Sequence, residues 1–464
     1  MRKATTAALT AATLLVAGGF YGLADALDIA PGVLTLADPA YDVQPFPSTN
    51  AQLAADGPAG LSPDAPVPSS AVLTGYAQTL AADELVGSGV TGVTVIDVAT
   101  GQTLVDLQGS TPLTPASSNK VITAWAALSA MGAEHRLTTS AVLSGTTVTL
   151  VGGGDVLMAA DAGDPTAVVG HAGLGDLARK AAEKLKEQGV TSVSVTLDDT
   201  MFEGPSWSPD WEAGNESWVA PIQPIMIDVT SFGSSTGYPA DPAMAAAEAF
   251  ATALSAAGIE VSGEVVRGAA PQGASALAAV ESAPLSEILA VSLKASDNTM
   301  TEVEGHVLAA ETGYPASFTG AAQAVRAVLE ADGFDTTGLT LLDASGLARG
   351  NKVPAQLLAQ IVARSAGEDG GTTGRTLLTA LPVAALDGTL EHRFEATTAA
   401  GRVRAKTGSL DQSVSLTGVV VTAEGRLLAY SVIIDGFAEG GLTAARVAVD
   451  QDLIGPMAAC GCQG

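Results

Sequence analysis

The stretch Pro115-Ala-Ser-Ser-Asn-Lys120 places a serine and a lysine three positions apart, just before a segment suited to a helix. Residues 118–131 are rich in alanine and contain neither glycine nor proline. This composition predicts a helix that begins at or near Ser117. Because residues three apart share one face of a helix, Ser117 and Lys120 are expected to point the same way, one turn apart.

Two further short motifs, Ser296-Asp-Asn298 and Lys406-Thr-Gly408, follow later in the chain and carry hydroxyl, carboxamide and amine groups that an acyl-transfer site could use. Ser-x-x-Lys and Lys-Thr-Gly each occur once, whereas Ser-x-Asn occurs three times, so the middle motif is the weakest signal. Taken alone, Ser117 would be read as a helix cap and Lys120 as a solvated helical lysine. Their joint occurrence with the other motifs favours one site assembled from three parts of the chain.

A serine hydroxyl becomes an effective nucleophile only when a neighbouring base accepts its proton. Lys120 can accept the Ser117 proton only when it is neutral, and burial beside a second cation, Lys406, would lower its pKa. Ser296 would relay a proton between Lys120 and the leaving amine. Asn298 would bind the amide carbonyl of the substrate and hold Lys120 in place.

The segment around Lys406 is also expected to bind substrate. The charge of Lys406 and the hydroxyl of Thr407 would hold a terminal carboxylate, which points to an exopeptidase. Gly408 would allow the strand to approach the substrate closely. The backbone NH groups of Ser117 and Ser409 would form an oxyanion hole.

The composition limits the function classes. With 464 residues, of which 47% are hydrophobic, the chain can bury a large core and should contain more than one domain. A net charge of −28 disfavours nucleic acid as a partner. We expect no metal site, because no His-x-x-x-His or Cys-x-x-Cys spacing is present and the histidines are scattered at His135, His171, His306 and His392. We also expect no cofactor, because the one candidate dinucleotide motif, Gly173-Leu-Gly175, has no convincing strand before it.

The N-terminal region resembles an export segment. Residues 1–26 begin with Met1-Arg2-Lys3, continue with an apolar stretch and end with Ala24-Asp25-Ala26. This pattern predicts a signal peptide cleaved after Ala26, with an uncleaved membrane anchor as the alternative. Either outcome places the catalytic part outside the cytoplasm. Residues 27–72, rich in alanine, proline, aspartate and glycine, predict a flexible linker.

The opposite end of the chain is expected to be a tail, residues 456–464. It carries both cysteines, Cys460 and Cys462, which are separated by one glycine. A disulfide across so short a loop would be strained, so free thiols or pairing between chains is the expectation.

Between these ends, residues 73–138 and 276–455 are expected to form the catalytic domain, with 139–275 inserted as one or more further domains. The strand-like segments 92–97, 103–106, 403–408, 414–422 and 427–434, with helices between them, favour one antiparallel sheet. Segments 142–151 and 192–197 make the insert β-rich. Its tryptophans, Trp207, Trp211 and Trp218, are expected to hold an irregular loop together rather than to form a binding platform.

With these motifs the chain resembles the D-alanyl-D-alanine carboxypeptidase/endopeptidases known as class C low-molecular-mass penicillin-binding proteins. The similarity runs from about residue 75 to 455 and includes Gly152-Gly-Gly-Asp155, Asp343-Ala-Ser-Gly-Leu-Ala-Arg349, Leu381-Pro-Val383, and Asp387-Gly-Thr-Leu390 with Arg393. It implies a multidomain α+β protein: a penicillin-binding-protein/β-lactamase-like transpeptidase domain, its antiparallel sheet flanked by helices, with a large β-rich insert. The departures are small, with Ser409 where threonine is frequent and Thr301 where alanine is common.

The resemblance implies hydrolysis of the terminal D-Ala of peptidoglycan stem peptides, cleavage of peptide crosslinks, and acylation of Ser117 by β-lactams. A membrane would be a partner only through an uncleaved N-terminal anchor. One alternative is a β-lactamase, but no Glu-x-x-x-Asn counterpart for a deacylating base is evident. The other is a non-catalytic scaffold that binds the cell wall, against which the intact motif residues argue.

Overall fold

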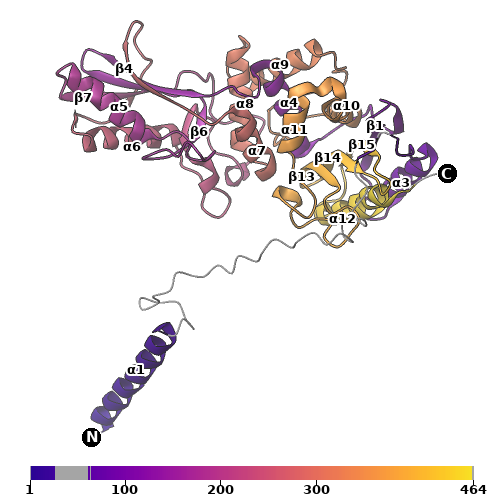
Figure 1. The fold of residues 1–464 in the computed structure, drawn as a ribbon, viewed down its shortest axis with the longest axis horizontal. Coiled ribbons are helices and arrows are strands. Elements are labelled where there is room, and N and C mark those ends of the chain that lie inside the picture. Colours follow the sequence, from indigo (N-terminus) through magenta and orange to yellow (C-terminus); the bar gives the residue numbers. More distant parts are fainter. Residues whose placement is uncertain (1, 27–60, 63, 462–464) are drawn as a thin grey trace. The chain divides into compact units, whose positions relative to one another are not determined.

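A computed structural model of the chain describes residues 2–26, 61–62 and 64–461 (Figure 1). The chain divides into two units, Met1–Pro58 and Ala59–Gly464. In the first, helix α1 (Arg2–Ala26) coincides with the expected signal or anchor. Among the described residues, no helix has both the length and the apolar character that a membrane span requires. Most of the expected linker, residues 27–60 and 63, lies outside the described residues.

A five-stranded antiparallel sheet with the strand order β13-β14-β15-β1-β2 organises the second unit. Its strands are β1 (Val90–Asp97), β2 (Thr103–Leu107), β13 (Val403–Leu410), β14 (Ser413–Val421) and β15 (Leu427–Asp435). β1 pairs with β15 along its whole length, so a strand from before the insert is joined to a hairpin near the end of the chain. The antiparallel sheet predicted from the sequence is confirmed.

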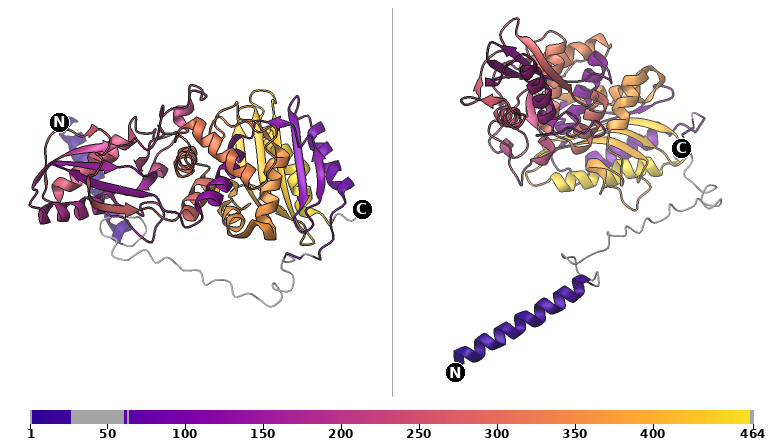
Figure 2. Two further views of the ribbon diagram at one scale, coloured as in Figure 1. Left: turned by 90° about the horizontal axis from the view of Figure 1, so that it is seen from above. Right: turned by 60° about the vertical axis from the view of Figure 1, so that its left-hand side comes forward.

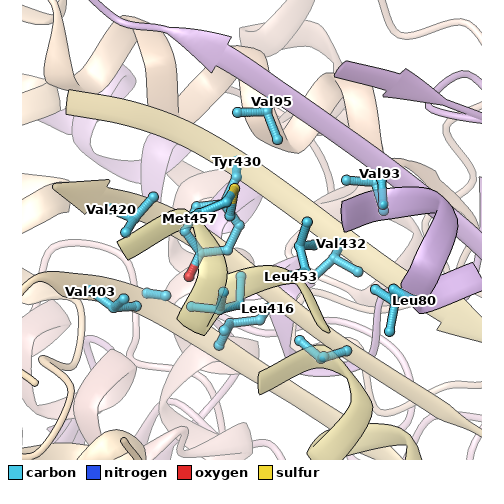
Figure 3. Packing of buried hydrophobic residues seen from close by; sticks show 14 of the residues in the cluster. Leu80, Val93, Val95, Val403, Leu416, Val420, Tyr430, Val432, Leu453 and Met457 are labelled. Carbon is cyan, nitrogen blue, oxygen red and sulfur yellow. The ribbon is translucent and has the colours of Figure 1, made fainter. Parts of the chain in front are cut away.

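Both faces of this sheet are buried. Leu428, Tyr430 and Val432 of β15 point into one apolar cluster, and Ala429 and Ile433 point into another. Successive side chains of a strand face opposite sides, so this alternation requires a helical cover on each face. Figure 3 shows the first cluster, with Tyr430 and Val432 among its labelled side chains.

Helices supply the two covers (Figures 1 and 2). The first face is covered by α3 (Ser70–Ala82), α12 (Leu442–Ala448), the π-helical turn η6 (Val449–Ile454) and α13 (Gly455–Ala459). The second is covered by α4 (Asn119–Met131), α10 (Ala355–Ala366) and α11 (Gly371–Ala380), with α7 (Leu285–Ala295), α8 (Asn298–Glu311) and α9 (Phe318–Ala331) packed in the same cluster. The remaining short elements around this sheet are β3 (Pro112–Leu113), β12 (Val353–Pro354), η1 (Ala116–Ser118), η4 (Glu368–Gly370) and η5 (Gly388–Leu390).

The segment between α4 and α7 forms a second, mixed sheet with the order β10-β7-β5-β4-β11 and β9 beside β7. Its strands are β4 (Thr138–Ser144), β5 (Thr147–Val151), β7 (Ser192–Asp198), β9 (Glu260–Val261), β10 (Val266–Arg267) and β11 (Ser275–Glu281). Helices α5 (Leu174–Glu187) and α6 (Pro242–Ala256) contact each other and share one apolar cluster with these strands. The remaining elements are the parallel pair β6 (Asp155–Met158) and β8 (Ile225–Ile227), with η2 (Asn215–Ser217) and η3 (Val229–Ser231).

The ordered structure extends further at both ends than the sequence suggested. Helix α3 begins at Ser70, inside the expected linker 27–72, and Arg426 Nη1 donates a hydrogen bond of 3.0 Å to the carbonyl of Ala65. The expected tail from residue 456 begins inside α13, because Met457 is apolar and is buried in the core. Cys460 is disulfide-bonded and does not carry a free thiol. Its neighbour Cys462 lies outside the described residues.

The short run 339–343 precedes a tight turn and pairs only through an isolated bridge between Thr340 and Lys352. The carboxylate of Asp343 accepts hydrogen bonds from the NH groups of Gly346 and Ala348, which turns the chain back on itself. A short apolar run does not by itself distinguish a strand from such a turn.

Leu416 of β14 offers a test of the core, because it is fully buried in the cluster of Figure 3. Leu416→Ala should lower the free energy of unfolding by about 2–5 kcal/mol, through lost burial and the cavity left behind. The matched control is Leu386→Ala at a side chain that is 67% exposed. Its change should stay within about 0.5 kcal/mol in the same urea titration. Equal losses in the two variants would contradict the packing described.

Candidate active site

Ser117 lies in the short turn η1, directly ahead of α4. The preceding Ala116 has a φ of 46°, in the left-handed region that is costly for a residue with a side chain. Ser415 of β14 donates a hydrogen bond of 2.6 Å to the carbonyl of Pro115 and so ties this turn to the sheet. The strained turn is therefore held by the sheet, at the edge of a cleft that Ser117 lines.

Lys120 connects the first two motifs. Its Nζ donates to Ser117 Oγ at 3.2 Å, to Asn298 Oδ1 at 2.7 Å and to the carbonyl of Ser345 at 2.9 Å. The side chain is fully buried. As predicted from the spacing, Ser117 and Lys120 point toward each other from one helical turn, while the contact with Ser345 had no counterpart in the sequence analysis.

The third motif joins the second through Lys406. Its Nζ donates to Ser296 Oγ at 2.7 Å and to the carbonyl of Thr407 at 2.9 Å, and the side chain is fully buried. Ser296 ends α7 in the left-handed conformation with φ 57°, and Asp297 then caps α8 by accepting a hydrogen bond from the NH of Met300. The second motif is thus a sharp junction between two helices, which turns Ser296 and Asn298 toward the two lysines.

The structure brings together all the candidate side chains. They surround a cleft of about 830 Å³ that is lined by Ser117, Ser296, Asn298, Thr407 and Ser409. Lys120 and Lys406 are fully buried, and their amines donate hydrogen bonds to the lining residues Ser117 and Ser296 respectively. A hydroxyl, two amines, a carboxamide and a second hydroxyl therefore converge on one place.

Strand β13 is the edge strand beside this cleft. The NH of Ala405 points outward and donates to the carbonyl of Pro382 at 2.9 Å. Alternate residues of an antiparallel strand direct their NH groups to the same side, so the NH of Ser409 also points away from the sheet, on the cleft side. At Gly408, a Cβ atom would lie 2.6 Å from the carbonyl oxygen of Pro115 and 3.1 Å from the nitrogen of Ser117. The backbone nitrogen of Ser117 therefore lies beside the residue that precedes Ser409, and both serines line the cleft.

Burial lowers the pKa values of the two lysines that contact the cleft residues. Desolvation lowers the pKa of Lys120 to about 8, against the opposing attraction of Glu302 and Asp343. Desolvation, followed by repulsion from Lys120, holds the pKa of Lys406 well below its usual value. Burial lowers the pKa of Lys120, as expected. The expected repulsion between the two amines, however, lowers the pKa of Lys406 and not that of Lys120.

A turn at residues 343–349, for which the sequence predicted no role, holds Lys120 through the carbonyl of Ser345. The Glu302 carboxylate accepts hydrogen bonds from the NH groups of Ala344 at 3.1 Å and Ser345 at 2.8 Å. Desolvation raises the pKa of Glu302 to about 8. Asp343, at the start of the turn, accepts from the indole Nε1 of Trp211 at 2.9 Å. The sequence indicates a family resemblance for residues 343–349 but no contact with Lys120.

The tryptophans of the insert have different roles. Trp211 is buried and makes edge-to-face contacts with Trp207 and Phe318, at ring centroid distances of 5.0 and 5.1 Å. These contacts hold a loop together, as expected. Trp218, by contrast, is 59% exposed, lines the cleft, and accepts a hydrogen bond of 2.9 Å from Asn298 Nδ2 through its carbonyl.

Gly408→Ala tests the close approach of β13 to the turn. The added methyl group would meet backbone atoms that cannot move freely, so we expect a loss of about 1–3 kcal/mol in the free energy of unfolding. Gly75→Ala is the matched control, because it lies in α3 with open space around its Cα. It should be neutral or stabilising by up to about 1 kcal/mol. A stable Gly408→Ala protein would show that the approach is looser than described.

Comparison with known proteins agrees with this geometry. Residues 74–240 and 234–453 match the family described as D-Ala-D-Ala carboxypeptidase 3 (S13). The chain is 38% identical to a carboxypeptidase of Mycobacterium tuberculosis over 80% of this chain and 81% of that protein. It is 29% identical to a D-alanyl-D-alanine carboxypeptidase of an Actinomadura species, over 76% of this chain and 79% of that protein.

Among solved structures, penicillin-binding protein 4 of Haemophilus influenzae has the same fold. The TM-score is 0.68 at 21% identity, covering 85% of this chain and all of that one. The fold class predicted from the sequence is thereby confirmed. By its match over most of its length and its identity to these relatives, the chain belongs to the D-Ala-D-Ala carboxypeptidase 3 (S13) family.

Proposed function

We propose that this protein is a serine-type D-alanyl-D-alanine carboxypeptidase/endopeptidase that acts on peptidoglycan stem peptides through an acyl-enzyme on Ser117. The observation that carries the proposal is the hydrogen bond of 3.2 Å between Ser117 Oγ and the fully buried amine of Lys120. A hydroxyl at the edge of a cleft, in contact with a lysine of lowered pKa, is the arrangement that an activated serine requires.

Acylation begins when Ser117 Oγ attacks the carbonyl carbon of the penultimate D-Ala and its proton passes to neutral Lys120. The negative charge that develops on the carbonyl oxygen is held by the NH groups of Ser117 and Ser409. The peptide C–N bond then breaks, and the terminal D-Ala leaves as an amine that has gained a proton. In the second step a water replaces the amine, Lys120 accepts its proton, and hydrolysis of the ester restores Ser117.

The other motif side chains position the reacting groups. Ser296 Oγ accepts a hydrogen bond from Lys406, which leaves its own proton available to the leaving amine. Asn298 uses Oδ1 to hold Lys120 and one N–H to bind the carbonyl of Trp218, so its second N–H is available for the amide carbonyl of the substrate. Cleavage of a crosslink uses the same steps, with a longer amine as the leaving group.

The charge of Lys406 is not well placed for its predicted role of holding the terminal carboxylate. Its Nζ is occupied by Ser296 Oγ and the carbonyl of Thr407, and burial favours the neutral amine. Lys406 is better suited to orienting Ser296. Thr407 lines the cleft, where its hydroxyl donates to Thr389 Oγ1 at 2.8 Å and can still accept or rotate toward a ligand.

The same site would react with β-lactams, whose ring amide offers the carbonyl that Ser117 attacks while the amine stays attached. The proposal also places the enzyme outside the cytoplasm, where stem peptides are found. Residues 1–26 support this with the charged, apolar and small-residue regions of a secretory signal.

Ser117→Ala should abolish both D-Ala release from a stem pentapeptide and labelling by a fluorescent penicillin, because no nucleophile remains. The thermal midpoint should stay close to that of the parent protein. Continued D-Ala release by the variant would refute the proposal. With the parent protein, a long-lived adduct supports the peptidase, rapid turnover of the drug would indicate a β-lactamase, and no adduct would indicate a scaffold.

The acylation rate should depend on pH through Lys120. Its pKa is lowered to about 8, and only the neutral amine accepts the serine proton. The rate of penicillin acylation should therefore rise about tenfold per pH unit below 8 and level off above it. Lys120→Arg should be inactive across this range, since a guanidinium stays charged. A flat profile from pH 6 to 9, or acylation of the arginine variant at the parent rate, would exclude Lys120 as the base.

A further inference from the structure

A terminal carboxylate that enters the cleft needs a cationic partner, and the amine of Lys406 is enclosed beneath it. Among the described residues, the arginines that line the cleft are Arg349, Arg393 and Arg446. Each is a candidate, because an arginine keeps its charge in a protein and forms strong hydrogen bonds to carboxylates. The three arginines differ in whether the guanidinium already forms an ion pair with an acidic side chain.

Two of the arginines are already paired. Arg349 binds Glu212 at 2.9 Å and Asp411 at 2.5 Å, so two carboxylates surround one guanidinium. Arg393 binds Asp450 of the π-helical turn, with two of its nitrogens donating to the two oxygens of that carboxylate. Neither has an uncompensated charge to offer a substrate.

Arg446 of α12 is different. In the part of the chain that the structure describes, no ion pair within 4.0 Å includes its guanidinium. Burial and the neighbouring charge of Arg393 lower the pKa of Arg446, against a weaker attraction from Asp450, whose carboxylate is bound by Arg393. A half-buried cation without an anionic partner is stabilised when an anion binds beside it.

The position of Arg446 matches the carboxylate end of the substrate. Its Nη2 donates to Ser409 Oγ at 3.1 Å. Ser409 and Thr407 are two apart on β13, so their side chains lie on the same face, and both line the cleft with Arg446. Ala445 and Ala448 are buried in the core on either side of Arg446, which fixes the helix against the sheet.

We propose that Arg446 is a substrate-binding residue that recognises the free carboxylate of the departing D-amino acid, together with the hydroxyls of Ser409 and Thr407. This inference rests on the proposed function. The Ser409 hydroxyl accepts a hydrogen bond from Arg446 and donates its own proton to the carboxylate. Arg446 thereby favours peptides that end in a free carboxylate over those in which this group is blocked.

The test compares two peptides, an N-acylated L-Lys-D-Ala-D-Ala and the same peptide with a C-terminal amide. Release of D-Ala or D-alaninamide is measured by mass spectrometry for the full-length parent protein, Arg446→Ala, Arg446→Lys and the cleft control Arg349→Ala. The parent should prefer the free acid. Arg446→Ala should lower kcat/KM for the acid by about 10- to 100-fold, the contribution of one charge-assisted hydrogen bond, and for the amide by less than about threefold.

Arg446→Lys should recover part of the preference for the acid, and Arg349→Ala should keep the parent's ratio between the two peptides. Saturating labelling with fluorescent penicillin confirms that each variant is folded and competent. An Arg446→Ala protein that labels fully and keeps the parent's preference overturns this inference alone, as does a parent with no preference. A parent that cleaves neither peptide and forms no adduct overturns the proposed function and this inference with it.

Discussion

The removal of Lys120 from water is the constraint on which the rest of the structure depends. An ammonium group in contact with solvent would stay protonated near neutral pH and could not serve as a base for Ser117. Here burial lowers the pKa of Lys120 to about 8. The cost of that burial is limited because Ser117, Asn298 and the carbonyl of Ser345 each satisfy a hydrogen bond from the amine. The fold has to deliver these acceptors from three separate segments.

The central sheet makes that delivery possible. Pairing of β1 with β15 joins two segments that are far apart in the chain, and β14 holds the turn before Ser117 through Ser415. Gly408 then allows β13 to lie against the same turn, which no residue with a side chain would permit without displacement. The insert contributes less to this arrangement, but its Trp218 carbonyl orients the Asn298 carboxamide and its Trp211 binds Asp343. Both parts of the chain therefore shape one cleft.

The sequence predicted the elements whose geometry is local. The spacing of Ser117 and Lys120 implied one helical turn, and the β-branched runs implied the antiparallel strands. The contact of Lys120 with Ser345 could not be predicted, because a backbone carbonyl leaves no mark in the residue type and its place depends on Glu302, in another helix. The enclosure of Lys406 and the burial of Met457 could not be predicted either, because each depends on packing against elements that are far away in the chain.

In the proposed mechanism, the role of each cationic side chain around the cleft follows from the effect of burial on its charge. A lysine amine loses its proton when it is desolvated, so Lys120 and Lys406 are suited to accepting and directing protons. A guanidinium keeps its charge under the same conditions, so Arg446 can hold an anion without taking part in proton transfer. In a chain of net charge −28, such a fixed positive charge has to be kept apart from acidic side chains. Near Arg446, the carboxylate of Asp450 is bound by Arg393, and its attraction for Arg446 is the weakest of the effects on that guanidinium.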